Sequence, residues 1–476
     1  MKLEEFLQTN YGYNPDIKKE LQDYISQWWS WYIGNVKSFH NYFIYNGKKK
    51  VAQARYTMNM AKEISEDWSD ILWSEKCEIS MKDETSQKNF EDLSDELKLN
   101  VLINQAIEKS GAIGTAGAVV SVYDMVQNED GMYLDVKDAK TRVDLVNIDW
   151  IYPLTWNNKG ITECAFGSVE YIGGIKYVVL SVHKMGEDGN YHIYNHLFRD
   201  VKGTLSEITD IEDTIRDFNT MSNKKWFSIF KPLLTNNLFE NSPFGIPHYA
   251  NAIDNLKAVD ISFDELKNEL VNGRKRTFVR ASMLNYDDGE QRLTFDPNDT
   301  TVYVLPDGAT KDDLIQSDTE TLRTSQQIET LNMNLNILGN KVGFGENHYH
   351  FDGTNLSTAT AVVSSNSKMF RRKKKLEIGY ESAIRDLVEA ICYASTKFGQ
   401  YAINTENMAI QFDDSIIEDK EAESNRALRE KNAGIISAVE YREKIFGETE
   451  EMAQQAIDAI NENEPSVQQL LGISNE

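Results

Sequence analysis

Two histidines, His348 and His350, lie in a glycine-bracketed loop and are the side chains that could most readily bind a metal ion. A bound metal would in turn allow hydrolytic chemistry on a phosphodiester. The loop contains no HExxH pattern, and no second histidine or cysteine cluster lies near it. Asn347, Tyr349 and Phe351 add amide and aromatic groups, and Asn, His and Tyr can touch phosphate or sugar without reading base sequence. The loop therefore favours a weak contact with something threaded past it over a catalytic pocket. An ordinary surface loop and a metal-dependent nuclease or hydrolase using the His348/His350 region remain the alternatives.

The residues after this loop continue the polar character and then become basic. Thr354 and Asn355 begin a hydroxyl-rich stretch that we assign to the same contact loop, 343–356. A basic run follows on the expected helix, and its members are Arg371, Arg372, Lys373, Lys374 and Lys375. Because the run covers more than one helical turn, its side chains point in several directions. We expect a solvated face that pairs with acidic neighbours, with a secondary DNA or subunit contact as the alternative.

Other motifs that would indicate an enzyme are missing. No GxxxxGK[ST] sequence occurs, so the phosphate cradle of an ATPase is absent. The Gly343-Phe-Gly345 sequence is not followed by a glycine three residues later, which excludes the dinucleotide fingerprint. The adjacent carboxylates Asp413 and Asp414 indicate a turn or helix cap rather than an acid–base pair. We therefore expect a protein that is not an enzyme and that binds no cofactor or metal.

Charge and cysteine content limit the class of protein further. The 476-residue chain has 50 Lys and Arg against 75 Asp and Glu, a formal charge of −25. This excess opposes tight clamping of nucleic acid, which needs many cations on phosphates, but it suits a surface past which DNA slides. Three widely separated cysteines form no CxxC pair, which fits a reducing compartment. Neither a signal peptide nor an apolar run long enough for a membrane is apparent, so we expect a soluble protein.

Hydrophobic periodicity predicts an α+β, predominantly helical fold. Residues 1 to about 110 have helical spacing, and residues 115–240 contain short β-rich runs separated by Gly and Asn-Asp turns. Further along, helices are expected over 252–272, 317–340 and 357–398, with a β-rich excursion over 274–316 between the first two. Gly379 is a candidate bend in the last of these helices. In the tail, the Ser437-Ala-Val-Glu440 capping box predicts a helix that Gly447 ends.

This order of elements implies a stalk. The helices 252–272 and 317–340, if side by side, would carry the β-rich excursion at one end and the loop 343–356 at the other. Such a stalk has few partners within its own chain. Its apolar faces would most easily be buried against neighbouring copies, which points to a ring.

Three stretches of the chain resemble the portal proteins of tailed bacteriophages, of the type found in long-tailed phages of Gram-positive bacteria. They are residues 58–79, 242–260 with its Ser-Pro-Phe-Gly-Ile-Pro start, and 358–370 with its Thr-Ala-Thr-Ala-Val-Val start. Weaker likeness occurs at 413–420 and 433–437. The likeness covers roughly residues 15–460, and the order of the stretches around the two stalk helices also matches.

The resemblance implies a ring of about twelve subunits at one capsid vertex. The ring would be part of the virion, and the particle would be assembled in the host bacterial cytoplasm. It implies the following parts: a wing (1–251), stem helices (252–273 and 317–342), a clip (274–316), a tunnel loop (343–356), a long wing helix (357–399), and a crown with the C-terminal tail (400–476). The implied partners are double-stranded DNA, the terminase large subunit ATPase, the head-tail adaptor, and capsid and scaffold proteins. Arg274, Lys275 and Arg276 lie at the start of the clip. They are expected either to dock an acidic partner or to contact carboxylates of a neighbouring subunit.

Overall fold

The structure is a computed structural model of the whole chain, and helices account for 47% of the residues and strands for 24%. This confirms a mixed α+β fold in which helix predominates. The residues that it describes are 2–45, 49–124, 126–127, 133–134, 139–209, 215–273, 276–280, 285–287, 292–294, 302–305, 315–318, 322–351, 359–399, 401–413 and 427–463. None of the described helices combines the length and the apolar character needed to cross a bilayer.

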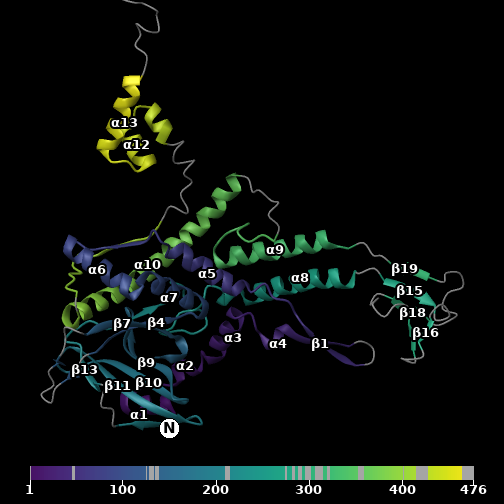
Figure 1. Cartoon of the computed structure of the whole chain (residues 1–476), viewed down its shortest axis with the longest axis horizontal. Helices are drawn as coiled ribbons and strands as arrows, with labels where there is room; N and C mark the ends of the chain where they lie inside the picture. Colours follow the sequence, from purple (N-terminus) through teal and green to yellow (C-terminus); the bar gives the residue numbers. More distant parts are fainter. Residues whose placement is uncertain are drawn as a thin grey trace, which may run out of the picture. The chain divides into compact units, whose positions relative to one another are not determined.

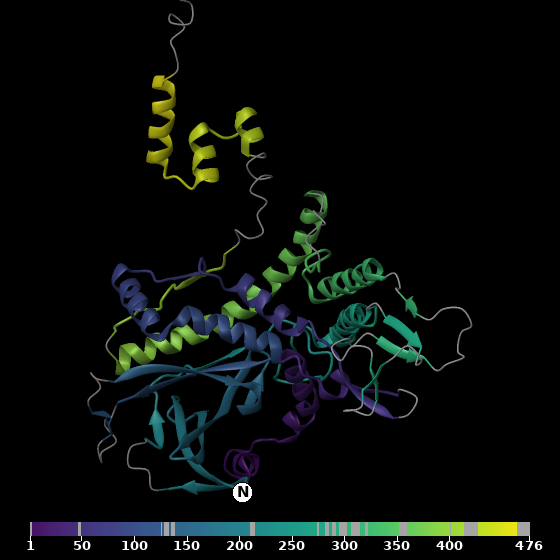
Figure 2. The same cartoon turned by 45° about the vertical axis from the view of Figure 1, so that its right-hand side comes forward.

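Two compact units divide the chain, one over Met1–Asp413 and one over Asp414–Glu476. The helices of the first unit are α1 (Leu3–Tyr11), α2 (Asp16–Lys19), α3 (Gln22–Tyr32), α4 (Lys37–His40), α5 (Met60–Leu72), α6 (Glu84–Leu97), α7 (Leu99–Ile113), α8 (Ile253–Asn272), α9 (Thr324–Val342) and α10 (Ala359–Phe398). Two short 3-10 helices, Ile148–Trp150 and Ala250–Ala252, precede β8 and α8. Figures 1 and 2 show α8 and α9 extending side by side from the larger body of this unit.

Two antiparallel sheets form the centre of the larger body. The first has the order β12-β11-β10-β9-β8 with β13 on β11, and the second has the order β14-β4-β7. Their bounds are β4 (Ala116–Tyr123), β7 (Lys140–Asn147), β8 (Ile151–Asn157), β9 (Gly160–Ile172), β10 (Ile175–Met185), β11 (Tyr191–Val201), β12 (Thr204–Ile208), β13 (Asp217–Asn219) and β14 (Phe227–Phe230). A small pair, β5 (Val126–Gln127) and β6 (Tyr133–Leu134), lies between β4 and β7 in the sequence. The β-rich character expected for 115–240 is confirmed.

The period-two pattern of the sheet produces the core. Val178, Leu180 and Val182 alternate along β10 and are buried on one face. Phe6 and Leu7 of the amphipathic α1 pack into the same cluster, so the first helix of the chain covers this face of the sheet. Burying each such side chain contributes about 1.5 to 3 kcal/mol relative to exposure. This core fixes the body from which the stalk helices extend.

The long helix α10 packs across the second sheet and contacts β14, β4 and β7. It runs without interruption through Gly379, where the sequence suggested a bend. A Cβ at this position would lie 3.0 Å from the Cβ of Leu233, so the close approach of that loop accounts for the glycine.

The helices α8 and α9 form the expected stalk pair. Leu256 and Val259 on α8 and Leu331 and Leu335 on α9 are buried, and Asn334 Nδ2 donates to Ser262 Oγ at 2.6 Å. Several large apolar side chains nevertheless stay exposed on the pair, namely Ile261, Leu270, Val271, Met333 and Ile337. The chain alone thus leaves part of the stalk's apolar surface uncovered, as its sequence indicated.

The excursion between α8 and α9 is β-rich, as expected, but it extends further than 316. Its strands are β15 (Arg276–Arg280), β16 (Asn285–Asp287), β17 (Arg292–Thr294), β18 (Val302–Leu305) and β19 (Ile315–Asp318). Because β19 pairs antiparallel with β15 up to Asp318, the helix expected from Ser317 begins only at Thr324. At residues 317–318, hydrogen bonding to β15 decides the structure, although the apolar residues that follow have helical spacing.

A β-hairpin interrupts the N-terminal region that was expected to be helical. Strands β1 (Asn41–Tyr45) and β2 (Lys50–Ala54) pair antiparallel, with Phe43 opposite Ala52. The sequence carries a partial signal for it, because aromatic and β-branched residues, which favour strands, occupy 42–45.

The second unit begins later than residue 400. Strand β20 (Ala409–Gln411) pairs with β3 (Glu78–Ser80), which joins residues up to Asp413 to the first unit. The second unit contains α12 (Ala438–Phe446) and α13 (Glu450–Asn463). The predicted capping box is confirmed: Ser437 Oγ accepts from Glu440 N at 3.1 Å, and Ser437 N donates to Glu440 Oε2 at 2.6 Å. Gly447 ends α12 with φ 66°.

Candidate functional site

Glycines hold the start of the candidate loop close to its neighbours. Gly343 follows α9 with φ 107°, and Gly345 has φ 95°. A Cβ on Gly343 would lie 2.9 Å from Arg372 Cγ and 3.3 Å from Trp68 Cζ2. In the structure these two glycines serve positive φ angles and, at Gly343, close packing.

A column of aromatic rings anchors the loop to α5. Phe344 stacks on Trp68 with ring centroids 4.5 Å apart, and His348 stacks on the other face of Phe344 at 4.2 Å. Trp68 and Phe344 are 0% and 1% exposed, so the anchor is buried. His248 continues the column beyond Trp68 at 5.6 Å. Burial, with a smaller contribution from the charge of Arg372, lowers the pKa of His248 to about 3, so it stays neutral.

Tyr349 is a structural residue of the loop rather than an exposed one. Only 8% of it is exposed, and its hydroxyl donates to Asp67 Oδ2 at 2.7 Å. His348 Nε2 lies 3.4 Å from the same oxygen. Burial and then the charge of Asp67 raise the pKa of Tyr349, which keeps the hydroxyl protonated as a donor. In this conformation the Tyr349 hydroxyl is therefore engaged by Asp67.

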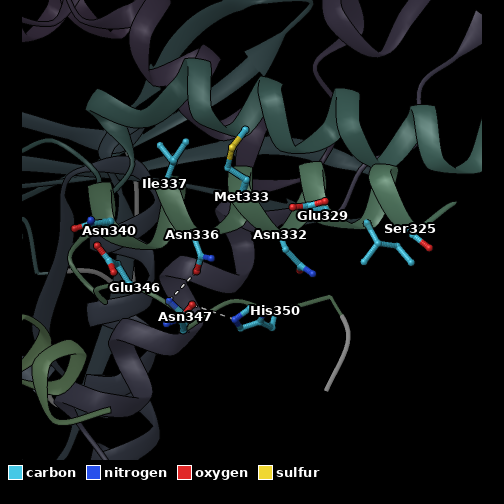
Figure 3. Close-up of a pocket in the computed structure, with 11 residues that line it drawn as sticks. Ser325, Glu329, Asn332, Met333, Asn336, Ile337, Asn340, Glu346, Asn347 and His350 are labelled. Atoms are coloured by element: carbon cyan, nitrogen blue, oxygen red, sulfur yellow. Dashed lines mark hydrogen bonds between the residues drawn. The ribbon is translucent and has the colours of Figure 1, made fainter. Parts of the chain in front are cut away.

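Asparagines on α9 hold the other side of the loop (Figure 3). Asn347 N donates to Asn336 Oδ1 at 2.7 Å. Phe351 N donates to Asn332 Oδ1 at 2.8 Å. His350 Nε2 lies 3.3 Å from Asn347 Oδ1. These contacts satisfy backbone groups that a loop would otherwise leave to water.

An open groove of about 650 Å³ lies between α9 and the loop, and the side chains that line it include Ile328, Glu329, Met333, Ile337 and His350 (Figure 3).

The candidate residues of the loop thus differ in exposure. Asn347, His348 and Phe351 are exposed and His350 is half-buried, whereas Tyr349 is buried. Thr354 and Asn355 lie outside the described residues. Sequence reasoning missed the residues that position the loop, although the spacing of Asn332, Asn336 and Asn340 along one helix face was a readable signal.

The basic run on α10 does not form one charged face. Lys373 is 0% exposed and donates to Glu377 Oε1 at 2.5 Å and to the Asp413 carbonyl at 2.7 Å. Lys374 pairs with the other Glu377 oxygen at 3.2 Å. Arg372 is half-buried, and burial lowers its pKa. Pairing with an acidic neighbour is therefore confirmed for Lys373 and Lys374. The expected solvated face is wrong for Lys373, which is buried.

Replacing Lys373 with alanine is expected to destabilise the first unit strongly. The change leaves Glu377, 6% exposed, without its buried partner, and breaking such a pair costs about 3 to 5 kcal/mol. The melting temperature of the purified protein measures the effect. Lys375→Ala removes the same charge from an exposed position of the run and should change the melting temperature little. Equal shifts for the two variants would contradict the structural role of Lys373.

The structure gives little support to the remaining candidate residues from the sequence. Arg274 and Lys275 lie outside the described residues, and Arg276 begins β15 opposite Asp318. His348 and His350, the ligands of the alternative hydrolase, have different partners. In the part of the chain that the structure describes, no group of three or more His, Cys, Asp or Glu residues is arranged to hold a metal ion.

Comparison with known proteins adds one match. A family model described as "Phage portal protein, SPP1 Gp6-like" matches residues 13–466. No curated protein matches the chain.

Proposed function

The chain belongs to the SPP1 Gp6-like phage portal protein family, and we propose that it forms the channel through which double-stranded DNA enters and leaves the phage head. Membership implies a capsid-associated oligomeric ring at a vertex of the virion, in a family that is generally structural rather than enzymatic. The observation that carries the proposal is the extent of the match, which spans both units of the fold. We further propose a closed ring of about twelve subunits, the number that the family resemblance implies.

Surface chemistry supports a channel. The stem helices α8 and α9 expose Ile261, Met333 and Ile337, which neighbouring subunits would cover. The net charge of −25 repels phosphate and leaves only sparse contacts with DNA. We propose that these contacts come from Asn347, His350, Phe351, Thr354 and Asn355, with His348 at their edge. A weak contact from each subunit would let the duplex slide.

The partners follow from the same proposal. The terminase large subunit ATPase docks on the clip during packaging, and the head-tail adaptor replaces it afterwards. Capsid and scaffold proteins surround the wing while the particle assembles in the host bacterial cytoplasm. At the clip, Arg274, Lys275 and Arg276 would meet acidic groups of the docked partner.

Inactivating the gene in the parent phage tests the function. Particles made without this protein should contain no nuclease-protected DNA, and supplying the chain in trans should restore packaging. The double variant Arg274→Glu with Lys275→Glu tests the clip assignment separately. Its rings should form but should bind the ATPase and the adaptor less tightly. Full heads in the absence of the chain would refute the portal function, whereas unchanged partner binding would refute only the clip assignment.

A further inference from the structure

The β1–β2 hairpin presents a largely exposed aromatic face. Phe43 and Tyr45 are 68% and 66% exposed and lie two residues apart, so they share one face of the strand. Ala52 pairs with Phe43 and Lys50 with Tyr45 across the hairpin, and both are exposed. A two-stranded hairpin is only marginally stable in water by itself. This outer face therefore has the composition of a buried contact.

Buried aspartates of α8 hold the base of the hairpin firmly. Asp260 is 2% exposed; it accepts from Met58 N at 2.9 Å, and its other oxygen lies 3.0 Å from His40 Nε2. One turn further, Asp264 accepts from Tyr56 N at 3.1 Å and from the Tyr42 hydroxyl at 3.2 Å. The contacts span both ends of the hairpin segment. The hairpin is thus presented in a fixed direction from the stem.

The groove along α9 is a receiving surface of matching chemistry. Met333 and Ile337 are 57% and 47% exposed and form its apolar floor. They lie about 120° to 160° around the helix from the buried Leu331 and Leu335, on its exposed side. Glu329 stands on the rim of the groove (Figure 3).

The hairpin and the groove lie on opposite sides of the stem. In both overall views α8 lies between the hairpin and α9 (Figures 1 and 2). A subunit therefore cannot place its hairpin in its own groove, but the next subunit of a ring can. Contacts between two different patches are heterologous, and such contacts close into rings.

The β1–β2 hairpin and the α9 groove also match in charge and in length. Lys48, Lys49 and Lys50 make the hairpin locally basic in a chain of net charge −25, whereas Glu329 makes the groove acidic. Neither Lys50 nor Glu329 has a salt-bridge partner in the part of the chain that the structure describes. Five extended residues of β1 span about 17 Å, close to the roughly 15 Å covered by the helical segment from Ile328 to Ile337.

We propose that the outer face of the β1–β2 hairpin docks into the α9 groove of the adjacent subunit. Phe43 and Tyr45 cover Met333 and Ile337, while Lys50 meets Glu329. The inference rests on the ring of the proposed function and specifies one of its subunit contacts. It also places the hairpin beside the loop 345–350, which forms the other wall of the groove.

Photo-cross-linking of the full chain tests the contact. p-Benzoylphenylalanine in place of Phe43 should link neighbouring subunits, giving a ladder of masses on a denaturing gel, with adducts mapped by mass spectrometry to residues 325–350. The same photoreactive residue in place of Tyr171, 72% exposed on β9, should give no adducts there. Rings without adducts in 325–350 would overturn the inference and leave the portal function standing. A protein that forms no rings by electron microscopy would overturn both.

A charge exchange tests the pairing independently. Lys50→Glu and Glu329→Lys should each weaken assembly, raising the protein concentration at which rings dissociate by about two- to fivefold, as for a partly exposed ion pair. The double variant should recover most of the loss. If the two single effects simply add in the double variant, Lys50 and Glu329 do not meet and this pairing is wrong.

Discussion

Particles assembled with Thr354→Glu and Asn355→Glu are expected to contain almost no DNA. The changes place carboxylates where the proposed loop meets the phosphate backbone. A carboxylate about 4 Å from a phosphate is opposed by about 1 to 4 kcal/mol, which predicts a loss of about tenfold or more in packaged DNA. Nuclease-protected DNA per particle measures the effect, and ring formation should be unchanged.

Glutamine at the same two positions is the matched control. It has nearly the size of glutamate without the charge, and particles carrying it should fill normally. Lysine at both positions should also impair packaging, by gripping the backbone through contacts that added salt weakens. Full heads with both the glutamate and the lysine pairs would show that this loop does not line the channel.

Phe344→Ala is expected to detach the loop from the body of the subunit. The ring of Phe344 is buried between Trp68 and His348, and such a truncation costs about 3 to 5 kcal/mol. Residues 345–351 would lose their aromatic anchor, although the hydrogen bonds to Asn332 and Asn336 remain. We expect a lower melting temperature, faster limited proteolysis within 343–351, and poor packaging.

Phe351→Ala makes the same chemical change at a residue of the same loop that is 39% exposed. It should leave the melting temperature and the proteolysis rate close to those of the unchanged protein. If the two alanine variants behave alike, the aromatic column does not hold the loop.

Much of the fold was predictable because local patterns and tertiary packing agree. The helix α8 lies within one residue of its expected bounds, and the Ser437 capping box forms as its sequence indicates. The errors occur where a partner strand decides the outcome. Residues 315–318 join β15 rather than the following helix, and β1 and β2 form a hairpin through cross-strand pairing.

The position of the candidate loop in the sequence could be predicted, but the contacts of its side chains could not. The sequence indicated the loop after Val342, yet glycines permit both movement and tight packing, and only tertiary contacts distinguish the two. Tyr349 looked available until Asp67, far away in the sequence, supplied its acceptor. Lys373 similarly belonged to a basic run, but on α10 it is buried and donates to the backbone carbonyl of Asp413. Long-range partners of this kind leave no local pattern.

Electron microscopy of the purified full-length protein tests the central claim most directly. The account predicts a single closed ring of about twelve subunits with a central channel wide enough for a DNA duplex, and native mass spectrometry should give the corresponding mass. A stable monomer or dimer at micromolar concentration, or an assembly without a central opening, would contradict the claim that this protein is a DNA channel.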